Sequence, residues 1–184
     1  MKTLINQVSP SMPIHARSED ATPYKVDKNP DINTPMSTSE EDKLIAHALL
    51  ILDSRLKKPG VGLSSPSAVK KYLTLQLAGE EIEYFCAMFL DVKNRVISFK
   101  KMFSGTLTQC AVYPREIVKN ALSQNACSVI FSHNHPSGDP EPSMSDDSLT
   151  ATLKIALDTV GIRVLDHVVI GAGVTYSYAE HGRI

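Results

Sequence analysis

Two histidines and one aspartate lie close together in the sequence and are of the residue types that bind a transition metal. His133 and His135 stand two residues apart in the segment SHNHPSGDP, and Asp146 follows eleven residues after His135. Residues two apart on an extended strand point to the same face, about 6.6 Å apart along the backbone, so both imidazoles can bind one ion. Two imidazoles and one carboxylate leave a tetrahedral zinc with an open fourth position, which is typical of a catalytic site.

The spacing around these residues is more specific than the residues themselves. A His-x-His pair alone leaves two readings equally open, because two polar side chains at a strand end also occur without a metal. The full pattern is His-x-His-Pro, six further residues and Ser-x-x-Asp. This segment is similar to the JAMM metalloprotease motif and matches it at His133, His135, Pro136, Ser143 and Asp146.

Beyond this motif, the chain resembles the bacterial RadC family of JAB/MPN-type domains. The resemblance covers about two-thirds of the chain, from about Ser64 to the C-terminus. Besides the motif, it rests on five segments: SSPSAVKKYL at Ser64, E-x-F-x-x-x-F-L-D at Glu83, GTL at Gly105, PREI at Pro114 and LDHVVIG at Leu165. It implies an MPN-like α/β fold, a Zn²⁺ site formed by His133, His135 and Asp146, and a metal-dependent hydrolase related to isopeptidases. A zinc ion with a free coordination position lowers the pKa of the water bound there to about 7, and it can polarise a substrate carbonyl.

Hydrolysis of an amide also requires a base that takes a proton from water and returns it to the leaving amine. By residue type alone, Glu80, Glu81 and Glu83 are interchangeable. The resemblance implies Glu83, which matches the upstream glutamate of the family pattern.

Ser143 has two interpretations. Its hydroxyl either caps the helix that begins before Asp146 or stabilises the attacking water and the developing oxyanion. Because Ser145 can supply the cap, we favour a catalytic role for Ser143.

Other polar residues near the motif are interpreted as structural. We interpret three flanking acids as solvated loop residues rather than ligands, namely Asp139, Glu141 and Asp147. His167 follows Asp166 and is either an ordinary hydrogen-bonded histidine on a strand, which we favour, or a residue that orients a metal ligand. The remaining histidines lack metal-ligand spacing, and Cys127 is expected in the core.

Four other classes of protein can be compared with a zinc hydrolase. A zinc nucleobase deaminase needs H-x-E with P-C-x-x-C, and a zincin needs H-E-x-x-H on a helix; the sequence has neither. A non-haem iron oxygenase shares the two-His, one-carboxylate ligand count, so the ligands leave iron open. The remaining alternative is a non-enzymatic DNA-repair-associated or protein-interaction module of the RadC family.

The elements predicted around the motif alternate between helices and strands. Hydrophobic periodicity and capping residues predict helices over 39–56 and from Pro66 to near Gly79, from Pro114, and over 146–160. Strands are predicted over 83–91, 95–103, 126–133 and 164–171, the first two forming a hairpin. The helix from Pro114 is expected to bury Ile117, Val118, Ala121 and Leu122. These patterns predict an α/β or α+β fold with a mixed sheet flanked by helices.

The chain is expected to consist of three parts. Residues 1–36 hold five of the eleven prolines and one aromatic residue, which predicts a disordered tail. A helical lead-in over 37–79 and a RadC-like metal-binding domain over 80–184 follow. The chain looks like a short family member, because the helix-hairpin-helix region of longer relatives is not evident; Gly60-Val61-Gly62 is interpreted as an ordinary loop.

Composition restricts the surroundings and partners of the protein. The 184-residue chain has a formal net charge of -1, which gives no support to DNA binding, and it has no apolar run long enough to span a membrane and no signal-peptide pattern. Three cysteines without a C-x-x-C pair fit buried thiols. We therefore expect a cytoplasmic enzyme that acts on a peptide or protein substrate, with a homodimer possible through exposed sheet edges.

Overall fold

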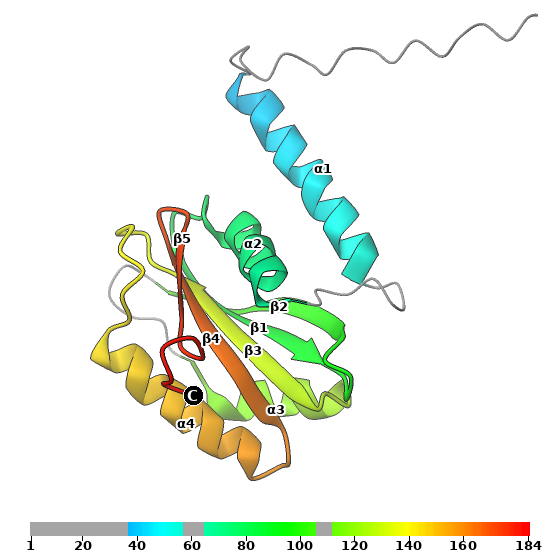
Figure 1. The fold of residues 1–184 in the computed structure, drawn as a ribbon, viewed down its shortest axis with the longest axis vertical. Coiled ribbons are helices and arrows are strands. Elements are labelled where there is room, and N and C mark those ends of the chain that lie inside the picture. The colour runs from blue at the N-terminus through cyan, green and yellow to red at the C-terminus, as the bar shows by residue number, and fades with distance from the viewer. Residues whose placement is uncertain (1–36, 57–64, 106–111) are drawn as a thin grey trace, which may run out of the picture. The chain divides into compact units, whose positions relative to one another are not determined.

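A computed structural model describes residues 37–56, 65–105 and 112–184 (Figure 1). The predicted tail over 1–36, Gly60-Val61-Gly62 and Cys110 lie outside the described residues. The described residues from Ser37 onward belong to one compact unit. In the described part, the elements in chain order are α1 (Thr38–Leu56), α2 (Pro66–Leu77), β1 (Glu83–Leu90), β2 (Val96–Gly105), α3 (Pro114–Ser123), β3 (Ser128–Asn134), α4 (Met144–Asp158), β4 (Arg163–Gly171) and β5 (Val174–Ser177).

The five strands form one mixed sheet in the order β2-β1-β3-β4-β5. β1 pairs antiparallel with both β2 and β3, and β4 pairs antiparallel with β5. β3 and β4 are parallel, and α4 is the crossover between them. The α+β fold class is therefore confirmed.

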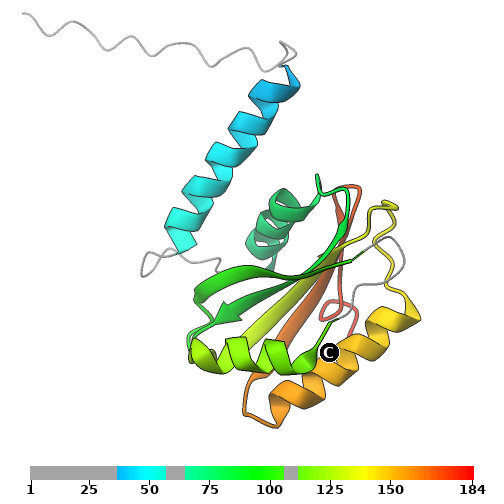
Figure 2. The ribbon, with the colours of Figure 1, turned by 180° about the vertical axis from the view of Figure 1, so that it is seen from behind.

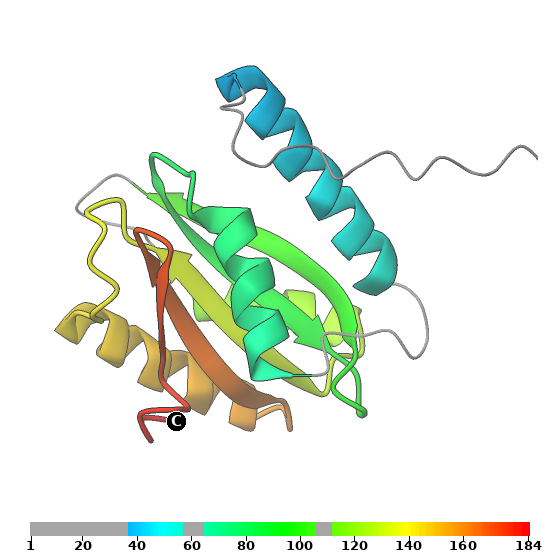
Figure 3. The same cartoon turned by 45° about the horizontal axis from the view of Figure 1, so that its top comes forward.

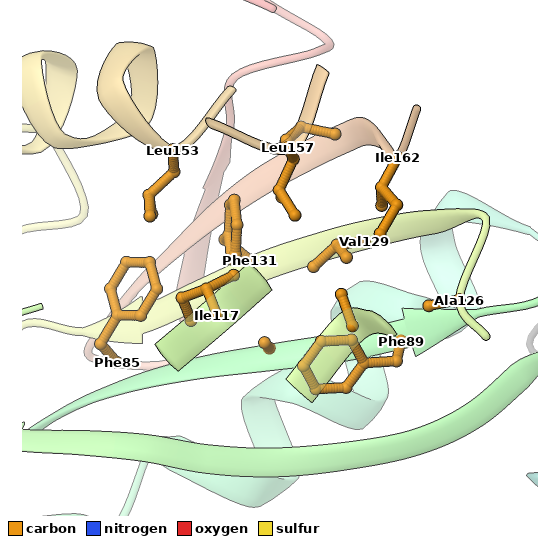
Figure 4. Packing of buried hydrophobic residues seen from close by; sticks show 12 residues of the cluster. Phe85, Phe89, Ile117, Ala126, Val129, Phe131, Leu153, Leu157 and Ile162 are labelled. Atoms are coloured by element: carbon orange, nitrogen blue, oxygen red, sulfur yellow. The ribbon is translucent and has the colours of Figure 1, made fainter. Parts of the chain in front are cut away.

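Helices cover both faces of this sheet. α3 and α4 lie on one face (Figure 2), and α2 lies across the other (Figure 3). Alternation along β1 serves both layers, because Phe85 and Phe89 pack toward α3 and α4 whereas Cys86 and Met88 pack toward α2. Figure 4 shows the first layer, in which Phe85, Phe131, Ile117, Leu153 and Leu157 pack together.

β3 is the middle strand of the sheet and the most deeply buried one. All seven of its residues are buried, including the polar Ser132, His133 and Asn134. Buried polar groups are normally hydrogen-bonded, so we expect specific partners for His133 and Asn134 in this covered strand. His133 and Asn134 have such partners, described below.

Some sequence predictions differ from the structure. Leu122 is 51% exposed rather than buried, because α3 turns its Ile117 and Ala121 side to the sheet and Leu122 lies about 100° around the helix from Ala121. On the predicted apolar face of α1, Leu52 packs against the core under α2, whereas Leu44 and Ile45 are exposed. β5 was not predicted; it is four residues long and follows a turn in which Ala172 and Gly173 both have positive φ.

Two further observations concern the whole described region. Within these ranges, no helix combines the length and the apolar character needed to cross a membrane.

Cys86 is buried and Cys127 is half-buried, and no disulfide joins the two. Burial of Cys86 agrees with the expected core thiols.

Candidate metal centre

The end of β3 places the two motif histidines on one face of the sheet. Side chains alternate along an extended chain, so His133 and His135 share a face and Asn134 points to the other. The backbone stays extended past the end of β3, because the His135 N–H donates to the carbonyl of Ile170, the residue that pairs with Asn134 on β4. His133 is 1% exposed, and His135 is partly accessible.

Asp146 meets the two imidazoles from the first turn of α4. The Nε2 atoms of His133 and His135 lie 2.9 Å apart. Asp146 places Oδ1 3.4 Å from the His133 Nε2 and Oδ2 3.6 Å from the His135 Nε2. One ligand atom from each residue lies within 4.8 Å of the others, so the structure brings together the three ligands predicted from the sequence.

The hydrogen bonding of His135 tests whether these atoms suit a metal. Its Nδ1 lies 2.7 Å from the backbone carbonyl of Asp139. A carbonyl oxygen only accepts, so Nδ1 carries the proton and Nε2 of the neutral ring presents a lone pair to the centre. An imidazole lone pair and a carboxylate next to a second imidazole form a donor set that zinc and several other transition metals accept. The residues fit a metal ion, and their types do not select which one.

Ser143 caps α4 and holds the carboxylate of Asp146. Its Oγ accepts from the Asp146 N–H at 3.2 Å and donates to Oδ2 at 2.6 Å, while the Ser143 N–H donates to the same Oδ2 at 2.7 Å. These contacts form a complete capping box. The expectation that Ser145 supplies the cap is wrong: Ser145 lies inside the helix, because the helix begins one residue after Ser143.

The imidazoles and the carboxylate affect each other's protonation. Burial opposes ionisation of Asp146, but His133 and His135 outweigh it and hold the pKa of that carboxyl well below its ordinary value. The carboxylate of Asp146 in turn raises the pKa of His135. The centre therefore attracts positive charge.

A close contact between backbones fixes the carbonyl that orients His135. The loop over 138–140 passes directly over Gly171 at the end of β4. A Cβ on Gly171 would lie 2.6 Å from backbone atoms of Gly138, Asp139 and Pro140. A glycine at this position therefore lets the Asp139 carbonyl reach the His135 ring.

Glu83 begins β1, the strand adjacent to β3, and is half-buried. Burial raises the pKa of its carboxyl, as does the charge of Asp146, whereas the charges of His133 and His135 act in the opposite direction. Of the two other glutamates, Glu80 pairs with Lys101 and Glu81 is exposed. Glu83 therefore lies in the electrostatic field of the three predicted ligands.

Asn134 is a residue that the sequence analysis missed. It is 3% exposed, its Oδ1 accepts the Tyr84 N–H at 2.9 Å, and its amide donates to the carbonyls of Glu80 and Ile82 at 3.3 and 2.9 Å. These bonds hold the backbone on both sides of Glu83. The sequence did carry a signal for this role, because Asn134 lies between His133 and His135 at the end of a strand. Strand alternation turns its amide side chain to the opposite face of the sheet from the two histidines.

Other candidates lie outside the group of three. The Asp147 carboxylate accepts from the Tyr178 hydroxyl and pairs with Arg183, while the Asp139 carboxylate accepts from the backbone of Glu141. His167 contacts His133 directly: its Nε2 lies 2.8 Å from the His133 Nδ1.

The fold and the site define a mixed α+β domain with a candidate metal centre at a strand-to-helix boundary. A family model described as RadC-like JAB domain matches residues 63–183. The chain belongs to this family, which confirms the resemblance found in the sequence.

Two relatives illustrate this membership. A UPF0758 protein of Janthinobacterium sp. (strain Marseille) is 58% identical over 125 residues, which cover 68% of this chain and 56% of the relative. The UPF0758 protein YkfG of Escherichia coli (strain K12) is 45% identical over 145 residues, which cover 79% of this chain and 92% of the relative. The chain thus spans about half the length of several curated relatives, 56% for the Janthinobacterium protein and also for a UPF0758 protein of Herminiimonas arsenicoxydans. It spans nearly all of YkfG.

Proposed function

We propose that this protein is a zinc-dependent hydrolase that cleaves a peptide or isopeptide-type amide. The main support is the convergence of the His133, His135 and Asp146 ligand atoms beside a half-buried glutamate. Membership of the RadC-like JAB domain family is consistent with amide hydrolysis, because the segment from His133 to Asp146 is similar to the JAMM metalloprotease motif.

His133, His135 and Asp146 would hold the ion. Bound zinc supplies a water of lowered pKa and polarises the carbonyl of the substrate. Glu83 takes the proton from the attacking water and returns it to the leaving amine nitrogen. A pKa above the ordinary glutamate value makes the Glu83 carboxylate a stronger base for the first proton transfer.

Ser143 positions Asp146 by binding its carboxylate with both hydroxyl and backbone N–H. Its hydroxyl proton is directed at Asp146, so a role at the substrate oxyanion requires the hydroxyl to rotate. The oxyanion role remains a prediction, tested below by a substitution that keeps the cap.

Metal analysis tests the first half of this proposal. Purified protein dialysed without chelator should contain near-stoichiometric zinc, and His135→Ala should lose it. His47→Ala is the matched control, because His47 is an exposed histidine on α1. Iron in place of zinc would redirect the work to redox chemistry, and no metal after loading would contradict the proposal.

Paired glutamate variants test the second half. Glu83→Gln should retain zinc and lose cleavage of amide and isopeptide substrates, whereas Asp146→Ala should lose both. Glu81→Gln removes the same charge from an exposed position two residues away and should behave as wild type. Full cleavage by Glu83→Gln would remove Glu83 from the mechanism.

A further inference from the structure

His167 is a fully buried imidazole between the candidate metal centre and the core. It lies on β4, beside β3, with no exposed surface. Its Nε2 lies 2.8 Å from the His133 Nδ1, and its Nδ1 lies 2.6 Å from the Thr150 Oγ1. A buried imidazole must satisfy both ring nitrogens, so the directions of these hydrogen bonds determine where its proton is.

The direction of the bonds is set at the backbone of Asp146. The Thr150 hydroxyl lies 2.6 Å from the Asp146 carbonyl oxygen. A carbonyl oxygen cannot donate, so Thr150 gives its one hydrogen to Asp146. The Thr150 Oγ1 is then the acceptor toward His167, whose Nδ1 must carry a proton.

The same reasoning continues to His133. His167 has no exposed surface, and its two ring nitrogens contact the Thr150 hydroxyl and the His133 imidazole rather than a carboxylate, so we assign a neutral ring whose single proton is on Nδ1 and whose Nε2 has a free lone pair. Nε2 therefore accepts from the His133 Nδ1–H. A neutral His133 then presents the lone pair of its Nε2 to His135 and Asp146, as a metal ligand must.

Packing holds the His167 ring in this orientation. Tyr178 stacks on it with ring centroids 5.0 Å apart and an interplanar angle of 18°. Phe85 and Phe131 contact it edge-on, with centroids at 5.5 and 6.0 Å. Aromatic contacts on several sides oppose rotation of the imidazole.

We propose that His167 is a positioning residue that fixes His133 in the Nδ1–H tautomer, and that Thr150 sets the direction of this relay. The relay joins two ligands, because it begins at the Asp146 backbone and ends at the His133 ring. This inference rests on the metal site of the proposed function and not on hydrolysis. A failure to find a cleaved substrate leaves its tests unaffected.

Nitrogen NMR of the full-length chain tests the tautomer directly. In zinc-loaded and metal-free ¹⁵N-labelled protein, we expect a ¹⁵N–¹⁵N coupling across the bond from His133 to His167, with the proton on the His133 Nδ1. A proton on the His167 Nε2, or the absence of such a coupling, would overturn the proposal.

Zinc affinity, measured by competition with a chelating dye, tests the consequence. His167→Phe keeps an aromatic ring without an acceptor and should weaken zinc binding about 10–100-fold. His167→Gln returns an acceptor and should recover much of this loss. Unchanged affinity in a folded His167→Phe variant would contradict the relay.

Thr150→Val provides a second test that leaves His167 in place. It should weaken zinc binding and allow the His167 proton to move between its two nitrogens in the NMR spectrum. Thr152→Val is the matched control, because the exposed Thr152 makes the same type of bond, to the Ser148 carbonyl, on the same helix. If His167→Phe does not fold, the comparison of Thr150→Val with Thr152→Val tests the proposal by itself. Equal zinc affinities and the same His167 protonation in the two variants would refute it.

Discussion

At the scale of single residues, His133, Asn134 and His135 divide the work between two faces of the sheet. The two histidines face Asp146, while the Asn134 amide binds the backbone that carries Glu83. Strand alternation thus couples the position of the proposed base to that of the ligands. A shift of one residue in β3 would reverse both assignments.

Replacing Asn134 tests this coupling. Asn134→Ala leaves the Tyr84 N–H and the Ile82 carbonyl without their present partner, which should cost about 1–3 kcal/mol of unfolding free energy. Zinc content should persist while amide cleavage falls, because the Glu83 backbone loses its anchor. Denaturant unfolding, metal analysis and a cleavage assay measure the three effects, with Asn120→Ala on α3 as control. Unimpaired cleavage by the variant would disprove the coupling.

The two roles of Ser143 can be separated by substitution. Ser143→Asn preserves a good N-cap, so stability should change by no more than a few tenths of a kcal/mol, whereas Ser143→Ala should lose about 0.5–2 kcal/mol. If the hydroxyl acts at the oxyanion, both variants lose cleavage. Thermal unfolding and the cleavage assay are the measurements, and full cleavage by Ser143→Asn would leave Ser143 with the cap alone.

Residue types and spacing were sufficient to predict the group of His133, His135 and Asp146, since all three lie in one short segment. They were insufficient for Asn134 and Thr150. The roles of these two depend on strand register and helix phase, which bring residues distant in sequence into contact. For His167 the sequence favoured an ordinary hydrogen-bonded strand histidine for the same reason, because its partner His133 lies on the neighbouring strand.

At the scale of elements, the close contact of the 138–140 loop with β4 determines the position of the Asp139 carbonyl. Gly171 permits this contact because it has no Cβ. The carbonyl fixes the His135 proton on Nδ1. The loop therefore acts on the candidate metal centre through its backbone.

Gly171→Ala tests the role of this loop. The added methyl group would lie 2.6 Å from backbone atoms, so the loop must move, at a cost of about 1–3 kcal/mol. We expect weaker zinc binding together with a lower Tm. Gly79→Ala is the control, because a Cβ at Gly79 meets nothing within 4 Å. Wild-type zinc affinity in Gly171→Ala would exclude the loop as an orienting element.

Most helices and strands were predictable from local patterns, because apolar periodicity and caps such as Ser65 before Pro66 mark them within the chain itself. β5 was not, since four residues carry little periodic signal. Its position depends on pairing with β4. The exposure of Leu122 was likewise unpredictable, because only the packing of α3 reveals which part of its apolar side meets the sheet.

At the scale of the whole molecule, Asp166 joins β4 to the C-terminal turn. Its carboxylate accepts from the N–H groups of His167 and Ala179 and from the Ser177 hydroxyl. Burial raises the pKa of this carboxyl above its ordinary value of 3.8 despite these bonds. The folded state therefore binds the Asp166 proton more tightly than the unfolded chain does.

This difference predicts a pH dependence of stability. Because the folded pKa is raised, the contribution of Asp166 is fully present below the unfolded pKa and is lost as pH rises through the folded pKa. Relative to Asp166→Asn, which cannot ionise, wild type should be more stable at acidic pH than at neutral pH. Thermal unfolding of both proteins across this range measures the difference. A constant difference in Tm would refute the assignment.

The three proposed ligands and the His167 relay all belong to the single β3-α4-β4 crossover, whereas Glu83 comes from β1. Contacts between residues close in sequence form with a smaller loss of chain entropy. We therefore expect the crossover, with its three proposed ligands, to form before β1 docks during folding. Under the proposed function, such an early intermediate would hold the ion without the base Glu83, and it would not cleave amides until β1 had joined the sheet.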